Sequence, residues 1–427
     1  MVKKEGIPEG YKLSEVGVIP KEWDVMTFEE VFSFLSSGSN SRSDLSEYGD
    51  TKYIHYGDIH TKWRHFLDIQ KDKLPYINND LVKGLPLLEE GDLVVADASE
   101  DYENIGISIE VKNIGDERVV AGLHTLLLRG NKELVADGYK GYIQSISTVK
   151  ESFRKNATGI SVYGISKKNL KTILIPLPPI PEQQAIAKAL GDMEELITLL
   201  TQLIKKKKSI KRGTLQQLLS GKKRLSGFID SWTPRNLGEC LSTKPEYGIN
   251  AAAVPYSDNL PVYIRITDIT PEGKFNKGNR VSVNSEDFLK FILEEGDIVF
   301  ARTGASTGKT YLYDTNDGQL VFAGFLIRVK VNQNILIPQF LKYYTETSKY
   351  WDWVKVTSVR SGQPGINGNE FAQLPIELPS LTEQKAISKI LFDMDKEIEA
   401  LQHKLEKYKA IKEGTIHNLL TGKVRLV

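Results

Sequence analysis

One segment of the sequence occurs twice, and this duplication constrains the fold more than any other feature. The stretch "LPPIPEQQAIAKALGDMEELITLLTQLIKKKKSIKRGTLQQLLSGKKRL" ends at Leu225, and "LPSLTEQKAISKILFDMDKEIEALQHKLEKYKAIKEGTIHNLLTGKVRL" ends at Leu426. The two align without a gap at a constant offset of 201 residues. Roughly half of the aligned positions are identical, far more than helical composition alone would give. The chain is therefore built from two related repeats.

A weaker duplication lies upstream of each copy. "YIHYGDI" (53–59) resembles "YIRITDI" (263–269), "LEEGDLVVA" (88–96) resembles "LEEGDIVFA" (293–301), and Trp23 has a counterpart in Trp232. "VAGLHTLLLR" (120–129) likewise resembles "FAGFLIRVK" (322–330). The offset drifts between these landmarks, so the upstream parts have diverged. Each repeat is predicted to be a variable, strand-rich globule followed by a constant helix.

Each constant segment is predicted to form one long helix. The proline-rich stretches "IPLPPIP" and "LPIELPS" set a rigid entry, and Gly221 and Gly422 suit a C-terminal cap. Apolar residues recur with alternating spacings of four and three, which is typical of a coiled-coil seam. The seam positions are Ile186, Leu190, Met193, Ile197, Leu200 and Ile204 in the first copy, where the pattern breaks at Lys207, and Ile387, Leu391, Met394, Ile398, Leu401, Leu405 and Tyr408 in the second.

A helix of nearly forty residues is about 57 Å long at about 1.5 Å per residue, so it extends beyond one globule and needs a partner. Its own repeat is the nearest candidate. The expected fold is α+β, with two strand-rich globules separated by a long antiparallel two-helix coiled coil and related by an internal pseudo-two-fold axis. The alternative is that each helix packs on its own globule.

Composition limits the class of protein. With 427 residues, of which 40% are hydrophobic and 26% charged, the chain suggests a soluble protein of two or three domains. The sequence lacks an apolar run long enough to span a membrane, and the N-terminal stretch lacks the apolar core of a secretory signal. We therefore expect a cytoplasmic protein. The single cysteine, Cys240, excludes an internal disulfide and a thiolate-rich metal site.

The stretch "FARTGASTGKT" (300–310) ends like a phosphate-binding nucleotide loop. Such a loop needs a glycine where this chain has Thr303, and it must lead into a helix. The residues that follow are instead aromatic and β-branched, which predicts strands. The segment is expected to be a β-hairpin with a polar tip.

Other enzyme motifs are weak. Glu110 and Lys112 form the E-x-K half of a metal-dependent nuclease site, with Asp97 or Asp101 as a possible second ligand, but this pattern is expected by chance in a charged chain. His55, His60 and His65 are five residues apart and share no face of a helix or strand. We therefore expect no metal site and no catalytic residues in this chain.

Several of these stretches together resemble the specificity (S) subunit of type I restriction-modification systems. They include "GVIPKEW", "EEGDLVVADASED", "AGLHTLLLR", the twice-occurring "LP…EQ.AI…L" before a long helix, and "LSGKKRL". The resemblance covers nearly the whole chain. It implies target-recognition domains at 1–173 and 227–374, and spacer helices within 174–226 and 375–427.

The resemblance also implies a function. Each globule would read one half of a bipartite, asymmetric target in double-stranded DNA, and the helices would set the half-site spacing. Two modification (M) subunits would dock on the helices and methylate adenine with S-adenosylmethionine, and restriction (R) subunits would add cleavage that depends on ATP and Mg²⁺. This chain would itself be non-catalytic, without a cofactor or metal of its own and without a membrane partner. The docking residues assigned are Ile186, Leu190, Met193, Ile197, Leu200, Ile387, Leu391, Met394, Ile398 and Leu401.

Polar loop residues are the candidates for DNA contact, since donors on loops suit phosphates and base edges, and arginine suits guanine best. In the first repeat they are Ser39, Asn40, Arg42, His60, Lys62, Arg64 and Ser161. In the second they are Arg302, Thr303, Ser306, Thr307, Lys309, Arg360, Ser361, Gln363 and Asn367. For each one, ordinary loop solvation is the competing interpretation. The first repeat has the acidic residues Asp97, Glu100 and Asp101 where the second has the arginine-bearing tip, so they are expected to contact bases or to be structural.

Two further hypotheses remain open at this stage. The chain could be a coiled-coil scaffold whose globules bind proteins, or an autonomous nuclease or nucleotide hydrolase. The basic run "KKKKSIKR" (205–212) could lie along DNA phosphates, bind an acidic partner surface or simply be solvated.

Overall fold

The computed structural model describes residues 7–426 and divides the chain into two compact units. Unit 1 comprises Met1–Leu200 and Lys404–Val427, and unit 2 comprises Thr201–His403. The segments 1–173 and 375–427 expected from the sequence include residues 1–6 and 427, which lie outside the described part. Each unit combines short strands with parts of both long helices, so the mixed α and β content expected from the sequence is present.

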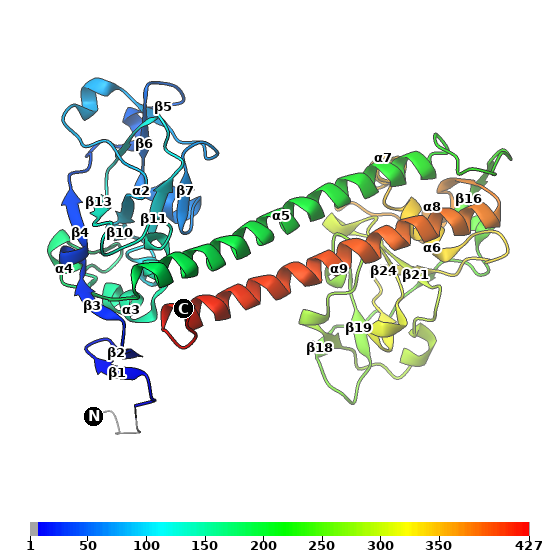
Figure 1. Cartoon of the computed structure of the whole chain (residues 1–427). Coiled ribbons are helices and arrows are strands. Elements are labelled where there is room, and N and C mark those ends of the chain that lie inside the picture. The colour runs from blue at the N-terminus through cyan, green and yellow to red at the C-terminus, as the bar shows by residue number, and fades with distance from the viewer. Residues whose placement is uncertain (1–6, 427) are drawn as a thin grey trace. The chain divides into compact units, whose positions relative to one another are not determined.

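The two long helices are α5, Ile180–Leu219, and α9, Leu381–Leu420, each of 40 residues (Figure 1). Gly221 and Gly422 follow the helix ends with φ of +67° and +69°, the left-handed conformation that favours glycine at this position. The predicted stop signals are therefore confirmed at both helices.

The core of unit 1 lies around a five-stranded sheet in the order β4-β13-β9-β11-β7. Its strands are Phe32–Leu35, Thr125–Gly130, Leu93–Ala96, Ser108–Lys112 and Phe66–Asp68. A second sheet has the order β12-β6-β8-β5, with strands Arg118–Ala121, Thr51–Ile54, Tyr76–Ile77 and Leu45–Ser46. Strands β9 and β11 pair antiparallel and form the first-repeat equivalent of the predicted hairpin.

Smaller elements complete unit 1. Two-stranded sheets join β1 with β2, β10 with β14, and β15 with β3. Their bounds are Tyr11–Ser14, Gly17–Pro20, Ala98–Ser99, Tyr163–Gly164, Leu174–Leu177 and Asp24–Thr27. The short helices α1 to α4 span Phe28–Val31, Tyr56–Thr61, Ser147–Asn156 and Lys167–Lys171.

Unit 2 repeats this plan with shorter strands. One sheet has the order β17-β24-β21-β22, formed by Glu246–Tyr247, Leu326–Val329, Ile298–Ala301 and Thr310–Leu312. The other has the order β18-β20-β19-β23, formed by Val254–Pro255, Val281–Ser282, Val262–Ile264 and Leu320–Phe322. Strand β16, Thr233–Asn236, pairs with β25, Pro375–Leu378, and helices α6 to α8 span Pro338–Tyr344, Ser348–Thr357 and Gly368–Ala372.

The Glu-Gln pair at the start of each long helix joins that helix to its globule. In unit 1 the Gln183 amide donates to the carbonyls of Pro178 and Leu134 at 2.8 and 2.9 Å, and its oxygen accepts from Ala136 N at 2.9 Å. Gln384 makes the matching set in unit 2, with Pro379, Ile335 and Ile337. These amides satisfy buried backbone groups, which would otherwise destabilise the fold.

Each Glu-Gln glutamate also binds an arginine and a tryptophan. Glu182 accepts from Arg425 Nε and Nη2 at 2.6 and 2.8 Å and from Trp23 Nε1 at 3.0 Å. In unit 2, Arg224 and Trp232 bind Glu383 in the same way, at 2.7 Å for both arginine nitrogens and 3.3 Å for the indole. The duplication seen in the sequence thus appears as the same contact set in each unit.

Within each unit the pieces of α5 and α9 run in opposite directions. In unit 1, Arg425 pairs with Glu182 and Lys412 pairs with Glu194, so the residue numbers rise along α5 while they fall along the segment that faces it. Unit 2 shows the same order, with Lys207 bound to Glu397 and Lys211 to Asp395. The expected antiparallel relation therefore holds inside each unit.

Candidate nucleic-acid interface

The hairpin that carries the nucleotide-loop-like segment is formed by β21 and β22, with residues 302–309 as its tip. A strand and not a helix follows the Gly308-Lys309-Thr310 sequence, so the tip has no helix N-terminus to hold a phosphate chain. Gly308 has φ of +89°, and a Cβ there would lie 2.7 Å from Val354. Packing in unit 2 thus requires a glycine at position 308.

Arg302 is the first residue of the tip and is half-buried. Its guanidinium lies 5.0 Å from the centre of the Tyr247 ring, and Nη1 donates to Gly324 O at 3.4 Å. This stacking leaves most of the five donors of the fork available to a ligand. Arg302 is therefore pre-oriented without being neutralised by a carboxylate in the part of the chain that the structure describes.

A second polar loop, residues 358–367, packs directly against this tip. Gly304 N donates to Pro364 O at 3.0 Å, Ile366 N donates to Arg302 O at 2.9 Å, and Thr303 forms a β-bridge with Gly365. The two clusters selected from the sequence of the second repeat are thus brought together into one surface, although about 60 residues separate them in the chain.

Several of the selected side chains in unit 2 have structural partners. Arg360 Nη2 lies 2.6 Å from both carboxylate oxygens of Glu370, and its Nη1 donates to the carbonyls of Thr357 and Val359. Asn367 caps α8 by accepting from Glu370 N at 2.9 Å. Arg360 and Asn367 therefore support the loop, and contacting DNA would require them to leave these partners.

The remaining residues of this surface divide by exposure. Thr307 is buried and its hydroxyl donates to Gly304 O at 2.7 Å, while the Thr303 hydroxyl lies 3.5 Å from Pro364 O. Ser306 and Lys309 are half-buried, and Ser361 and Gln363 are exposed. The surface that a ligand can reach is thus formed mainly by Arg302, Ser306, Lys309, Ser361 and Gln363.

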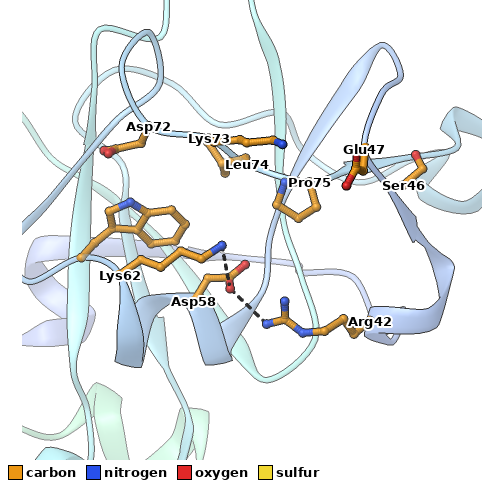
Figure 2. Close-up of a pocket in the computed structure, with 10 residues that line it drawn as sticks. Arg42, Ser46, Glu47, Asp58, Lys62, Asp72, Lys73, Leu74 and Pro75 are labelled. Carbon is orange, nitrogen blue, oxygen red and sulfur yellow. Dashed lines mark hydrogen bonds and ion pairs between the residues drawn. The ribbon is translucent and has the colours of Figure 1, made fainter. Parts of the chain in front are cut away.

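In unit 1 the structure brings Arg42 and Lys62 together around Asp58 (Figure 2). Both cations lie 3.1 Å from Asp58 Oδ1, and Asp58 itself is only 2% exposed. Asp58 Oδ2 is buried without a hydrogen-bond partner among residues 7–426. These groups line a cavity of about 520 Å³, whose walls are completed by Ser46, Glu47, Trp63, Asp72, Lys73, Leu74 and Pro75.

The other selected residues of unit 1 lie apart from this cavity. His60 Nε2 donates to Ala98 O at 2.9 Å, Ser39 and the Arg64 side chain are exposed, and the Asn40 carbonyl accepts from Tyr53. Ser161 lies in an exposed loop beside Ile160, which is 93% exposed. The structure thus groups Arg42 with Lys62 and leaves Arg64 and Ser161 outside the group.

A cluster that the sequence did not reveal lies at the corner between β12 and β13. His124 Nδ1 is 3.2 Å from Asp97 Oδ1, and the His124 ring meets Tyr56 edge-on at 5.2 Å between centres. His124 has φ of +54°, unusual for a residue other than glycine. Burial raises the pKa of Asp97, and the neighbouring His124 acts to lower it. In the sequence, only Asp97 pointed to this cluster, because it aligns with Arg302 of the second repeat.

The E-x-K motif does not form a metal site here. Glu110 is 2% exposed and accepts from Gly138 N and Gly141 N at 2.6 and 2.8 Å, with Lys140 Nζ 3.8 Å away. Burial raises the pKa of Glu110 to about 7. Lys112 points elsewhere, over the Phe66 ring. Among residues 7–426 no group of three His, Cys, Asp or Glu side chains is placed to hold a metal ion.

The seam residues of the helices lie mostly inside the fold. Ile186 and Leu190 belong to the core of unit 1, together with Tyr142 and Phe153, and Ile387 and Leu391 belong to the core of unit 2. Leu200 and Ile398 are buried, while Met193, Ile197, Met394 and Leu401 are partly exposed. The first two seam positions of each helix thus pack on its globule, which was the alternative raised from the sequence.

Among residues 7–426, no helix combines the length and the apolar composition that a membrane span needs.

Comparison with known families gives a match over most of the chain. A model for the type I restriction modification DNA specificity domain matches residues 20–211 and again residues 232–410. The two matches correspond to the two repeats of the sequence, since each begins near Trp23 or Trp232 and ends within a long helix.

Individual relatives agree with this match. The type I restriction enzyme MjaVIII specificity subunit of Methanocaldococcus jannaschii is 26% identical over 434 residues, which cover 96% of this chain and 94% of the relative. The type I restriction enzyme EcoKI specificity subunit of Escherichia coli K12 is 24% identical over 336 residues, which cover 74% of this chain and 70% of the relative.

Solved structures share the fold. The S subunit of a type I restriction-modification system from M. genitalium superposes with a TM-score of 0.56 at 14% identity, covering 98% of this chain and 99% of that one. A chain from a structure of complex assembly and conformational transition in the type I R-M system gives a TM-score of 0.55 at 15% identity, covering 95% and 99%.

Proposed function

The chain belongs to the family of type I restriction modification DNA specificity domains, and from this premise we propose that each of its two units reads one half of a bipartite, asymmetric DNA sequence. In this proposal residues 1–173 and 227–374 are the two target-recognition domains. The segments 174–226 and 375–427 carry the spacer helices that fix the gap between half-sites.

The observation that carries this proposal is the surface of unit 2, where two separate polar loops converge around Arg302. The tip 302–309 and the loop 358–367 are held together by backbone hydrogen bonds, so their side chains keep a fixed arrangement. Fixed donors on rigid hairpins are what base readout in a groove requires. Ser306, Lys309, Ser361 and Gln363 supply further donors on the same surface.

Unit 1 supplies a different donor set, around the cavity beside Asp58. Arg42 and Lys62 lie beside a cavity, and both are exposed although they share the buried Asp58. Unequal side chains on two units with the same plan would read unequal half-sites, which agrees with an asymmetric target. The other polar residues of each loop would contact phosphate and sugar, and these contacts do not depend on the base sequence.

Partner subunits would attach through the helices. The seam residues are largely internal, so we assign docking of two M subunits to the outer faces of α5 and α9, beside the partly exposed Met193, Ile197, Met394 and Leu401. The M subunits would bring S-adenosylmethionine and methylate adenine. The R subunits would add cleavage that needs ATP and Mg²⁺.

We also propose that this chain is non-catalytic. Support comes from the two segments that most resembled enzyme motifs. The 302–309 tip leads into a strand, and the Glu110 carboxylate is occupied by two backbone amides and Lys140. Neither segment has the geometry that its enzyme motif requires.

The test is to co-express the chain with the M subunit encoded beside it and to map adenine methylation across a genome. A split motif with two defined halves and a constant gap is the expected result. Replacing residues 1–170 with the corresponding segment of another family member should then change one half of the motif only.

The competing proposal, a scaffold whose globules bind proteins, predicts a different result. It predicts a stable complex with the M subunit but no sequence-dependent methylation. A motif that is continuous, or that changes in both halves after the 1–170 exchange, would contradict assignment of one half-site to each unit.

A further inference from the structure

The two units share a backbone corner that presents side chains of opposite character. In unit 1, Asp97 N donates to His124 O at 3.1 Å, and in unit 2, Arg302 N donates to Phe325 O at 3.0 Å. Both corners are closed from the other side by an isoleucine amide: Ile165 N donates to Asp97 O at 2.8 Å, and Ile366 N donates to Arg302 O at 2.9 Å. Asp97 and Arg302 are therefore equivalent positions in space as well as in sequence.

Both side chains at the unit 1 corner reach solvent. The side chain of His124 is 49% exposed and that of Asp97 is 29% exposed, with 3.2 Å between Nδ1 and Oδ1. In unit 2, Phe325 is 58% exposed and Arg302 stacks on Tyr247. In each unit, the two side chains at this corner are thus accessible to a ligand.

The backbone of unit 1 fixes the position of His124 beside Asp97. His124 has φ of +54°, a conformation that residues with a Cβ adopt only where surrounding structure fixes it. The Tyr56 ring, at the start of α2, supports the imidazole edge-on at an interplanar angle of 76°. Strained residues of this kind concentrate at functional sites, because a fold selected for stability alone would relax them.

A carboxylate is an unusual group to present to DNA, since phosphates repel it. It becomes favourable where it accepts a hydrogen bond from the amino group of cytosine in the major groove, the base-edge donor that acidic side chains read. The imidazole beside it orients the carboxylate, with 3.2 Å between His124 Nδ1 and Asp97 Oδ1. The guanidinium at the same corner of unit 2 has the opposite hydrogen-bonding sense and suits guanine.

We propose that Asp97, oriented by His124 and Tyr56, is a specificity-determining residue of unit 1 that reads a cytosine at one position of its half-site. The proposal rests on the function proposed above, and it adds the residue, the base and the chemical group that is recognised. Asp97 accepts from cytosine N4, and His124 is a positioning residue.

The experiment uses the full chain with its M subunit. Methylation motifs are mapped for the wild type, Asp97→Asn and His124→Gly, and binding is measured on duplexes that carry each base pair at every position of the motif. Glycine adopts φ of +54° without strain, so His124→Gly removes the ring and keeps the backbone. Asp116→Asn is the matched control, because it removes one exposed negative charge outside the tip, in the connection between β11 and β12.

Asp97→Asn is expected to reduce discrimination for a C·G pair at one position of one half-site by about 5- to 150-fold, the range of a single good base contact. His124→Gly should relax the same position less strongly. Asp116→Asn should leave the motif unchanged, because it removes a charge but no base contact.

Three results would overturn the inference. One is an unchanged motif in both Asp97→Asn and His124→Gly, another is relaxation at an A·T position, and the third is equal relaxation in Asp116→Asn. If Asp97→Asn does not fold, the result for His124→Gly decides. A wild-type chain that directs no bipartite methylation would instead contradict the proposed function, so the two failures are distinguishable.

Discussion

Arg425 donates two hydrogen bonds to Glu182, at 2.6 and 2.8 Å, and joins residues that are 243 positions apart in the chain. Glu182 is 2% exposed, and its other partner is the Trp23 indole. The last residues of the second repeat therefore close unit 1. The pair has an equivalent in unit 2, where Arg224 binds Glu383.

Removing this arginine should destabilise unit 1. Arg425→Ala leaves a buried carboxylate without its cation, which costs about 3–5 kcal/mol in the free energy of unfolding. Arg425→Lys should cost less, because it keeps the charge but loses the planar fork. Urea unfolding with peptide-resolved hydrogen exchange would measure both effects. In Arg224→Ala the loss of protection should appear in unit 2, and a loss below about 1 kcal/mol for Arg425→Ala would show that the pair is dispensable.

The stability of unit 1 should fall in two steps as the pH decreases. Burial lowers the pKa of His65 below 6.5, so below that pH the unfolded chain takes up a proton that the folded chain does not, and stability is lost. Glu194 is bound by His65 and Lys412, and these contacts lower its pKa from 4.5 to about 2 although burial opposes them. Its contribution is full above pH 4.5 and is lost as the pH falls toward 2.

Two substitutions separate these steps. His65→Gln should flatten the change that begins below pH 6.5, and Glu194→Gln should flatten the change below pH 4.5, which is worth about 3 kcal/mol from the size of the pKa shift. The measurement is the urea midpoint as a function of pH. An unchanged pH profile in both variants would show that other groups control the acid sensitivity.

Arg302 should determine one base position in the half-site of unit 2. Arg302→Ala removes a pre-oriented guanidinium and should cost about 1–3 kcal/mol of binding to the cognate duplex while relaxing one position. Arg302→Lys keeps the charge and should still relax that position, because lysine lacks the bidentate fork. Methylation mapping and competition binding test this, and an unchanged preference at every position would exclude Arg302 as a reader.

The basic run of α5 should act on DNA through its exposed members only. Lys205, Lys206 and Lys208 are exposed, whereas Lys207 pairs with Glu397, and Lys211 pairs with Asp395 and Glu346. Changing the three exposed lysines to glutamine should weaken binding equally for all sequences. It should also reduce the slope of log K against log salt by up to about 0.9 per lost contact.

Lys211→Gln is the comparison for this experiment. It should lower the stability of unit 2 and leave the salt slope unchanged, because its charge is already paired. If the triple variant keeps the wild-type salt slope but loses M-subunit binding, the run is a docking surface for protein and not for DNA.

Local and repetitive features of this protein could be predicted from its sequence. The offset of 201 residues revealed two repeats, the two glycines marked the ends of α5 and α9, and the residues after Gly308 predicted a strand and not a helix. Periodicity, capping and turn preferences act over a few residues, so the sequence carries them directly. The family resemblance rested on these same stretches.

Only the tertiary structure decided which side chains are available for recognition. Nothing in the sequence indicated that Arg360 is held by Glu370, and the sequence left open whether the first seam residues lie in the globular cores. It also did not reveal that His124 stands beside Asp97, or that Arg425 closes unit 1 on Glu182. These pairs join residues from 10 to 243 positions apart, and they depend on burial and on the partners that packing supplies. A linear pattern records residue types and spacings, whereas exposure and pairing arise only when distant segments meet.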